Sequence, residues 1–443
     1  NKMLINHQKF IEQENKYIKF FEFSAFCSIP IFFILGSFFV NFVLVLMSLY
    51  CIFLGMNKIY FLNKKDYFIV IFLFIFLIIN SYLSNFISYT LLKSSSYFRF
   101  LLFFYFCIYF LITSKYSHKK IFSFLISIIV VFVIFDLIIQ YSTGTDLFGY
   151  KIDHTTAYGR LGGPFGNELI VGSYLFCFGF ISYACLRQFC NINYLYQVIY
   201  LSLISVAIFV TGERNAFLCT LLFLISLFIL NKKSRKTIFL VSLIVFFICS
   251  LILKNDNYLS DRYSFSTIPK LIKNDNSEAT NNIELEKTKK NNIIEKKNII
   301  INSQWFAHYR AGIRIFENNK IFGSGFRTFR FECRNIIDKE NILCANHPHN
   351  IYIELISDTG LIGLSIFIVS ILYIIFIFFK RKLYNEEFTS ILLCILISFI
   401  FPLKPHGSLF STTNAFMIWY ILTFLFWSTF YQINYNTNKN DLK

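Results

Sequence analysis

The chain has 443 residues, of which 56% are hydrophobic and 15% are charged, and its formal net charge is +17. A water-soluble protein of this length would carry charge on about a quarter of its residues. The composition therefore excludes a large soluble domain and indicates an all-α membrane protein. In such a protein Lys and Arg concentrate in cytoplasmic loops, so the positive charge predicts orientation in a membrane and no nucleic-acid partner.

A helix that crosses a bilayer needs roughly 20 mostly apolar residues, and this rule predicts a polytopic bundle of about twelve transmembrane helices. The first apolar stretch is not followed by a small-residue cleavage site, so we expect a retained helix and not a removed signal peptide. The first two stretches meet at Gly36-Ser37 and could form a hairpin or one long tilted helix. The expected spans are 20–35, 37–56, 67–85, 97–114, 120–140, 167–186, 193–210, 214–230, 237–253, 350–379, 387–402 and 412–432.

Alternate loops between these spans carry Lys or Arg, and they predict which side of the membrane each loop faces. The basic loops are 57–66, 114–119, 187–192, 231–236 and 380–386. Because basic loops remain in the cytoplasm, both chain ends are predicted to be cytoplasmic.

This orientation divides the chain into three regions. Residues 1–253 are expected to form the N-terminal transmembrane helices with short outward loops, and 350–443 the C-terminal transmembrane helices. Between them, 254–349 form one large, partly helical outward loop. Its 255–298 stretch is rich in Asn, Lys and Glu and is expected to be poorly ordered or a solvated helix. The 303–318 stretch has helical apolar spacing and is expected to be an amphipathic helix on the membrane face.

Arg214 ends the short outward turn that begins at Thr211. A charged group at membrane depth is costly and usually functional, and a guanidinium binds phosphate through its planar fork. Arg214 is therefore a candidate anion-binding residue. The alternatives are a local ion pair with Glu213 or an anchor to lipid headgroups.

Arg160 lies in a glycine-rich stretch, residues 159–166, that precedes the helix expected from Asn167. Glycine permits close backbone approach, and a helix N-terminus attracts anions. The stretch could thus form an anion site or an ordinary tight turn.

Arg310 and Arg314 are four residues apart, so they share one face of the expected amphipathic helix. They could bind an anionic substrate, face water or attract lipid headgroups. Gly323-Ser324-Gly325 should break any helix that follows. Arg327, Arg330 and Arg334 come next, and most of them are expected to be solvated.

His347 and His349 flank a proline directly before a predicted outward helix end. They lack Cys or carboxylate partners at zinc-ligand spacing, so no metal site is predicted. A neutral imidazole can accept a hydroxyl proton near pH 7, which makes general-base chemistry the better interpretation. Asn350 or His349 could also cap the helix, and the two roles are compatible.

Cys333 and Cys344 bracket a polar stretch of the outward loop. In an oxidising compartment they could form a disulfide, or they could remain two free thiols. Most of the other cysteines lie in apolar runs and are expected to be small packing residues.

The sequence resembles the superfamily of O-antigen ligases and O-antigen polymerases, which are bacterial inner-membrane glycosyltransferases. His349-Asn350, nine residues and Gly360-Leu-Ile-Gly363 look like the ligase pattern. The stretch 315–325 resembles the family segment that ends in Gly-x-Gly, and Thr211–Ala216 resembles the family's Ser-Arg element. The cysteines resemble the paired-Cys arrangement of a bacterial subgroup.

Two departures concern the large loop. The family's Arg upstream of Gly-x-Gly falls near Trp305 here, so Arg310 and Arg314 are the nearest substitutes. The usual proline before Gly-x-Gly is Lys320. The resemblance spans roughly 159–363.

The resemblance implies a metal-independent, inverting glycosyltransferase without a cofactor, in the bacterial inner membrane with its active site periplasmic. Its donor would be a glycan on undecaprenyl diphosphate, and its acceptor the lipid A core or another lipid-linked glycan, among membrane lipids. His349 would act as the base with Arg214 as its catalytic partner. Arg160, Arg214, Arg310 and Arg314 would bind the diphosphate, and His347, Asn350 and His308 would support the site.

Two related reactions and one transport function remain as readings of the sequence. The His-Asn to Gly-x-x-Gly spacing favours the ligase, which moves a finished glycan to the lipid A core. A polymerase would instead join lipid-linked repeat units. A transporter of lipid-linked oligosaccharides is disfavoured, because transporters often contain internal repeats and this chain has none that we recognise.

Overall fold

The computed structural model describes residues 16–56, 64–152, 159–263, 304–336 and 342–431, and this part of the chain is helical without any named strand. Of the stretch 255–298, which is predicted to be poorly ordered or a solvated helix, residues 264–298 lie outside the described residues. The helices are α2 (Lys16–Ile34), α3 (Ser37–Met56), α4 (Lys64–Tyr82), α5 (Ile87–Thr113), α6 (Tyr116–Thr143), α7 (Val171–Tyr174), α8 (Phe180–Cys185), α9 (Tyr194–Val210), α10 (Arg214–Leu230), α11 (Arg235–Asn255), α12 (Asn257–Tyr263), α15 (Gln304–Asn318), α16 (Phe329–Asn335), α17 (Ile351–Lys380), α18 (Glu387–Phe399) and α19 (Thr412–Phe430), with short turns η1 (Gly163–Phe165), η2 (Leu175–Gly179), η3 (Leu186–Cys190) and η4 (Leu383–Asn385).

Each of the twelve predicted spans contains a helix, but some of these helices are too short to be assigned as membrane-spanning by length and composition. Within the described residues, seven helices are long and apolar enough to cross a membrane, namely α2, α3, α5, α6, α11, α17 and α19. Four others, in α4, α9, α10 and α18, are apolar but shorter. The all-helical membrane fold is therefore confirmed, and the total of about twelve spans remains a prediction.

Several boundaries differ from those predicted. α2 and α3 are two helices that turn at Gly36, with φ of 103°, so the hairpin reading is correct. α5 begins at Ile87, well before the expected 97, because polar residues in its first turns are still helical. The helix expected from Asn167 starts only at Val171, and wide π-helical turns interrupt it at η2 and η3.

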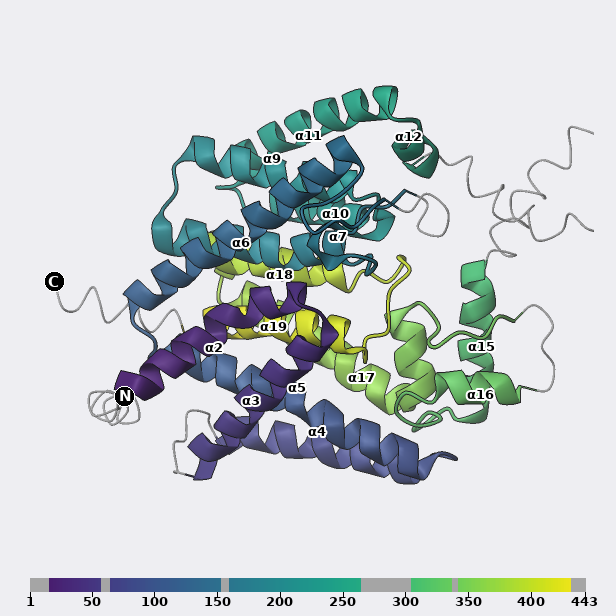
Figure 1. Cartoon of the computed structure of the whole chain (residues 1–443). Helices are drawn as coiled ribbons and strands as arrows, with labels where there is room; N and C mark the ends of the chain where they lie inside the picture. Colours follow the sequence, from purple (N-terminus) through teal and green to yellow (C-terminus); the bar gives the residue numbers. More distant parts are fainter. Residues whose placement is uncertain (1–15, 57–63, 153–158, 264–303, 337–341, 432–443) are drawn as a thin grey trace, which may run out of the picture.

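The helices run roughly side by side, so the bundle has two ends, and the predicted inward loops 114–119, 187–192, 231–236 and 380–386 meet at one of them (Figure 1). Arg187 forms an ion pair with Glu387 at 3.0 Å. Arg381 donates to the carbonyl oxygen of Thr429 at 2.7 Å. α2 begins at this end and α19 finishes there, as the alternation of basic loops predicts.

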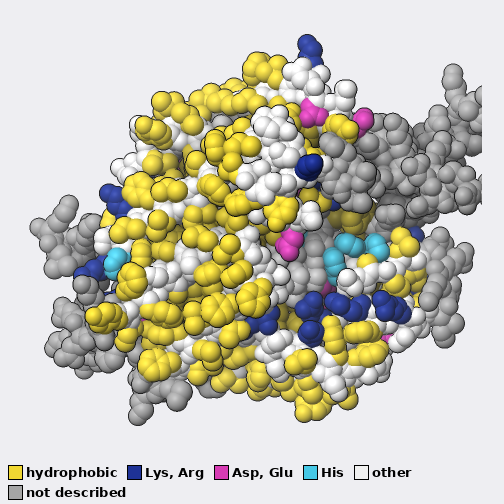
Figure 2. Space-filling view, viewed as in Figure 1, with side chains coloured by type: hydrophobic (Ala, Val, Ile, Leu, Met, Phe, Trp, Pro, Cys, Tyr) yellow, Lys and Arg dark blue, Asp and Glu magenta, His cyan; other side chains and the backbone are white. Residues whose placement is uncertain are grey.

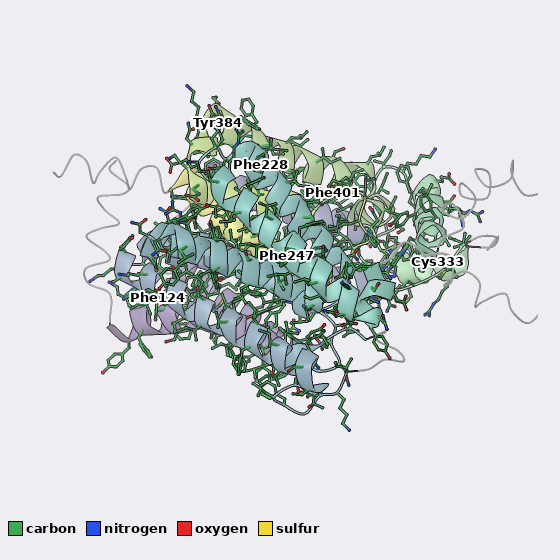
Figure 3. The ribbon with its side chains drawn as sticks, turned by 90° about the horizontal axis from the view of Figure 1, so that it is seen from above. Phe124, Phe228, Phe247, Cys333, Tyr384 and Phe401 are labelled. Atoms are coloured by element: carbon green, nitrogen blue, oxygen red, sulfur yellow. A yellow bond between two sulfur atoms is a disulfide. The ribbon has the colours of Figure 1, made fainter. Side chains whose placement is uncertain are left out.

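The predicted outward loops meet at the opposite end. Asn80 donates to the carbonyl oxygen of Phe322 at 2.6 Å, and the N–H of Leu161 donates to Thr211 O at 3.2 Å. α12, α15 and α16 all lie at this end (Figure 1). Cys333 is correspondingly at the far tip of the molecule when it is seen from above (Figure 3).

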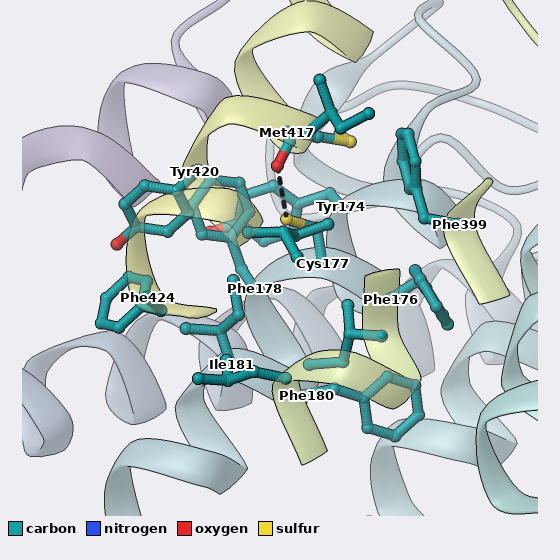
Figure 4. Packing of buried hydrophobic residues seen from close by; sticks show 14 of the residues in the cluster. Tyr174, Phe176, Cys177, Phe178, Phe180, Ile181, Phe399, Met417, Tyr420 and Phe424 are labelled. Carbon is teal, nitrogen blue, oxygen red and sulfur yellow. Dashed lines mark hydrogen bonds between the residues drawn. The ribbon is translucent and has the colours of Figure 1, made fainter. Parts of the chain in front are cut away.

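Aromatic rings fill the centre of the bundle, where the interrupted α7–η3 segment packs against α19. Figure 4 shows Tyr174, Phe178 and Tyr420 in this layer. The Phe178 and Tyr420 rings are 5.3 Å apart, and the thiol of Cys177 points at the carbonyl oxygen of Met417. Eight of the nine free cysteines in the described residues are buried, which agrees with their predicted packing role.

A glycine-to-glycine contact joins the outward loop to α17. α17 is kinked at Gly360, where φ is 64° and ψ is −166°. The N–H of Ser324 donates to Ser357 O at 2.9 Å, and that of Gly325 to Asp358 O at 3.0 Å. A Cβ on Gly360 would lie 2.3 Å from a backbone oxygen of the loop, so only glycine permits this approach.

α15 is amphipathic as predicted, but protein covers much of its apolar face. Ala307, Ala311 and Ile315 are buried against Phe329 and Cys333 of α16. In Figure 1, α15 runs across the direction of the spanning helices at their outward end. The expected contact of this apolar face with the membrane is thus largely replaced by a contact with α16.

Candidate functional site

Three histidines gather where α15 meets the start of α17. The ring centroids of His347 and His349 are 4.2 Å apart, and those of His308 and His349 are 4.9 Å apart. The Trp305 ring lies against His349 at 5.1 Å. His308 is tied to the loop through Leu343 O at 2.8 Å. The three predicted imidazoles therefore form one cluster, although 39 positions separate His308 from His347.

Gly312 allows this cluster to form. A Cβ at this position would lie 2.3 Å from the side chain of Ile353 and 3.5 Å from that of Pro348. The absence of a side chain lets α15 lie directly on the first turn of α17. His308 is one turn away from Gly312 on the same helix face, so the same contact brings its ring to His349.

The backbone of His349 is held in a specific conformation. Its φ is 57°, in the left-handed region that residues with a Cβ rarely adopt. Its carbonyl oxygen accepts from the N–H of His406 at 2.7 Å. Asn350 then caps α17, because its side-chain oxygen accepts from the N–H groups of Tyr352 and Ile353. The predicted helix cap is therefore present beside a constrained imidazole.

Burial keeps the imidazoles of His347 and His349 neutral. It lowers the pKa of His347 to about 4, and the neighbouring His308 and Arg330 act in the same direction. The pKa of His349 is also lowered to about 4, by burial and then by His347 and His308. A neutral imidazole has a free nitrogen lone pair near pH 7, which a general base requires.

A second cluster contains two of the predicted arginines and one that sequence reasoning missed. Arg262, from α12, donates to the carbonyl oxygen of Gly212, and a Cβ on Gly212 would lie 3.4 Å from the Arg160 side chain. Burial, followed by Arg160 and Arg214, lowers the pKa of Arg262 to about 10. Three cations thus share one half-buried position, which an anion would stabilise.

No local pattern in the sequence marks Arg262. It lies nine residues after the ninth predicted span, in the stretch expected to be poorly ordered or a solvated helix. The structure has α12 there, and Tyr263 packs on Phe209 with ring centroids 4.5 Å apart. The start of this stretch is thus a helix, one of the two predicted alternatives, and an aromatic anchor holds it against the bundle.

Glu213 holds the turn before Arg214 in place. Its carboxylate accepts from the N–H of Gly172 at 2.7 Å and from the N–H and hydroxyl of Ser173. Burial raises the pKa of Glu213 to about 7, and these hydrogen bonds and Arg160 oppose the rise. Glu213 is thus bound to the start of α7, which is a different role from the suggested local pairing with Arg214.

The glycine-rich stretch around Arg160 is a tight turn and not an anion cradle. A Cβ on Gly162 would lie 2.0 Å from Gly166 O, and the N–H of Gly163 donates to the side chain of Gln140 at 2.8 Å. The N–H groups at the start of α7 are taken by Glu213. The suggested helix N-terminal anion site is therefore occupied by protein, and Arg160 contributes through its side chain alone.

The loop between α18 and α19 connects the two clusters. His406 donates its N–H to His349 O, as described above. Lys404 is buried and lies against the thiol of Cys219, which is five residues along α10 from Arg214. Burial lowers the pKa of Lys404 and, with Lys404, that of His406 to about 3. Arg214 and His349 thus lie at the same end of the bundle, on either side of one loop.

Arg310 and Arg314 are half-buried on α15, the helix that carries His308. At 100° per residue, Arg310 lies about 200° around the helix from His308, whereas Gly312 faces α17. Helix geometry therefore turns Arg310 away from the imidazole cluster. The choice between these two arginines stays a prediction.

Cys333 and Cys344 form a disulfide in the structure, with their Cα atoms 5.6 Å apart. The bond joins α16 to the loop segment that leads to His347. It therefore fixes the approach to the imidazole cluster. No group of three or more metal-ligating side chains that could hold a metal ion occurs in the described part of the chain.

Two arginines expected to be solvated lie beside the imidazoles. Arg327 and Arg330 act electrostatically on His347, and both are partly buried, whereas Arg334 is exposed. Arg327 has φ of 63° and directly follows the loop that packs on Gly360. Sequence reasoning missed them because only the contact with Gly360 turns this stretch toward the imidazoles.

Comparison with known proteins supports the predicted resemblance. Residues 199–368 match the family model described as O-antigen ligase. The matched range contains Arg214, the imidazole cluster and the Gly360 contact. A comparison with curated proteins found no match.

Proposed function

We propose that the protein is a glycosyltransferase that moves a glycan from undecaprenyl diphosphate to an acceptor sugar hydroxyl at the periplasmic face of the bacterial inner membrane. The observation that carries this proposal is the pairing of a neutral, constrained His349 with a cationic cluster around Arg214 at one end of the bundle. The family match to O-antigen ligases agrees with it.

The proposed reaction needs only these two groups. The acceptor oxygen attacks the anomeric carbon, and the bond from that carbon to the diphosphate oxygen breaks. The hydroxyl proton passes to His349, and the electron pair of the broken bond leaves with the diphosphate. Arg160, Arg214 and Arg262 stabilise the charge that develops there. Attack opposite the leaving group inverts the anomeric centre, and no metal or cofactor is required.

Two acceptors fit this chemistry. The motif spacing favours ligation to the lipid A core, as the sequence predicted. A second basic cluster, formed by Arg327 and Arg330 with Lys93 and Arg99, favours a polymerase that joins two lipid-linked glycans. This cluster lies beside an apolar cavity that Phe326, next to Arg327, lines.

The test is the glycan profile of a strain that lacks this chain, complemented with the wild type or with His349→Ala. A ligase predicts long polymer retained on the lipid carrier in the deletion strain. A polymerase predicts loss of the ladder with a single repeat still attached. The His349→Ala strain should match the deletion strain in either case, and a wild-type profile from it would remove His349 from the mechanism.

A further inference from the structure

Four cations of the outward end gather away from Arg214. Lys93 and Arg99, from α5, act electrostatically on one another, and Arg327 acts on both. Arg330 acts on Lys93 and on His347. In Figure 2, dark blue side chains form a row directly beside the cyan histidines. Like charges held this close repel each other, so the cluster is suited to bind an anion.

The nearby carboxylates do not neutralise this cluster by themselves. Glu354 and Asp358 are within electrostatic reach of Arg327. Glu354, however, accepts from the hydroxyl of Ser408, and Asp358 accepts from the N–H of Phe329 at 3.1 Å. These hydrogen bonds hold the loops near the cluster in place. Two carboxyl groups are also too few to neutralise four cations.

Two buried guanidinium nitrogens at the cluster lack an acceptor. The Nε atoms of Arg99 and Arg330 have no hydrogen-bond partner among the described residues, while another guanidinium nitrogen of Arg99 donates to Asn41 Oδ1 at 3.0 Å. Buried donors without a partner are rare and need an explanation, such as an unoccupied ligand position. Phosphate oxygens would accept from both guanidinium groups.

An apolar cavity of about 360 Å³ begins at the same place. Phe326, next to Arg327, lines its outer end, with the rings of Tyr97 and Phe410 at 5.2 and 4.4 Å. The cavity continues between α4, α5, α17 and α19 as far as Ile374 and Phe426. Its walls are almost entirely hydrocarbon, which suits a lipid chain.

The length and packing of α17 indicate how a lipid could enter. The lining residues of α17 run from Leu355 to Ile374, a distance of about 28 Å at 1.5 Å per residue. Only 17% of the spanning stretch of α17 is buried in protein, against 67% for α19. Most of α17 is therefore exposed on the surface of the bundle, so a single long chain can reach the cavity beside it from the membrane.

We propose that Lys93, Arg99, Arg327 and Arg330, with the cavity along α17, bind a polyisoprenyl phosphate lipid, and that this lipid carries the acceptor glycan. The phosphate would lie on the four cations and the isoprenoid chain in the cavity. One narrow cavity matches a single-chain lipid, whereas lipid A has several acyl chains. The acceptor role rests on the proposed function, in which His349 is the base: Arg327 and Arg330 act electrostatically on His347, whose ring lies 4.2 Å from that of His349.

The test is native mass spectrometry of the full-length protein in detergent, titrated with undecaprenyl phosphate. Two bound lipids per chain are expected. The double variant Arg327→Gln/Arg330→Gln should lose one of them, with at least tenfold weaker binding, and Arg214→Gln should lose the other. Arg334→Gln removes an exposed charge of the same loop and should keep both. Ser370→Trp, which fills the cavity without touching the cations, should weaken the same lipid as the double variant.

Three outcomes would overturn the second site. One is a single bound lipid that only Arg214→Gln removes. Another is unchanged binding in both Arg327→Gln/Arg330→Gln and Ser370→Trp. The third is displacement by equimolar phosphatidylglycerol, which would show an ordinary anionic-lipid site. Two specific lipids together with full glycan transfer by His349→Ala would instead contradict the proposed function and leave the second site standing.

Discussion

The two ends of the bundle treat their positive charges differently. At the inward end, cations are matched within the protein: Arg187 pairs with Glu387, and Arg381 bonds to Thr429 O. Lys119 lies over the ring of Trp427 at 4.7 Å. At the outward end, the cations within the Arg214 cluster act on one another, as do those within the Arg327 cluster, although Arg262 also donates to Gly212 O and Arg99 to Asn41 Oδ1. The first arrangement stabilises the fold, and the second prepares sites that an anion completes.

The strongest test of this contrast removes the base or one cation from the outward end. His349→Ala and Arg214→Ala should each lower glycan transfer by about 10²–10³-fold, because one positioned base or charge donor typically contributes that much. Membrane insertion should be unchanged. The measurement is polymer transfer in complemented cells, normalised to the amount of protein.

Arg187→Ala is the matched control, since it removes an Arg from the inward end. It should leave transfer within about twofold of the wild type, because its partner is protein and not substrate. A loss as large as that of Arg214→Ala would erase the distinction between the two ends.

The next test moves the imidazoles without changing them. Gly312→Val places a branched side chain against Ile353 and should push α15 away from α17. A displacement of about 1 Å at a catalytic group can cost up to 10²-fold in rate, so transfer should fall by about 10–10²-fold. Gly55→Val is the control, because a Cβ there meets no atom within 4 Å. Equal activity of the two variants would mean that the α15 contact does not position the site.

The lowered pKa values of the imidazoles also predict that acid destabilises the folded protein. The folded pKa values of His347 and His349 are about 4, below the unfolded value of about 6.5. The unfolded chain therefore binds more protons between these values. The stability that these groups contribute is complete above pH 6.5 and is lost as pH falls towards 4.

Thermal unfolding in detergent at pH 7 and pH 4.5 measures this loss. Between pH 7 and pH 4.5, the melting temperature of the wild type should fall by more than that of the double variant His347→Asn/His349→Asn. Identical pH dependence in both proteins would show that the imidazoles are not held neutral by the fold.

The smallest expected effect concerns the inward pair. Glu387→Gln should lower the free energy of unfolding by about 0.2–1 kcal/mol, the usual range for a partly exposed ion pair. Glycan transfer should not change. Urea or thermal unfolding at two salt concentrations measures the effect, and a drop in transfer would contradict a purely structural role at this end.

Much of the fold was predictable because hydrophobic length is a local property. The apolar stretch 237–253 and the helix α11 coincide within two residues at each end, and the basic loops gather at one end as expected. The interrupted helix around η2 and η3 was not predictable. Its π-helical turns depend on packing against Tyr420 and Ile204, which lie far away in sequence.

The site was predictable in part. His349, Asn350 and Arg214 were singled out from their positions beside helix ends, and all three lie at the outward end. Arg262 and Arg327 were missed. Their importance comes from α12 folding back on Gly212 and from the loop packing on Gly360, and neither contact leaves a local pattern in the sequence.

The sequence by itself determined that this chain is helical and membrane-spanning, and the placement of Lys and Arg predicts its orientation, because apolar length and basic loops act over single segments. Only the tertiary structure decided which cations lie together and which imidazoles they accompany. Those neighbours come from segments that lie far apart in the chain, such as Lys93 and Arg330, which 237 positions separate, and glycines such as Gly312 and Gly360 set how closely the loops approach.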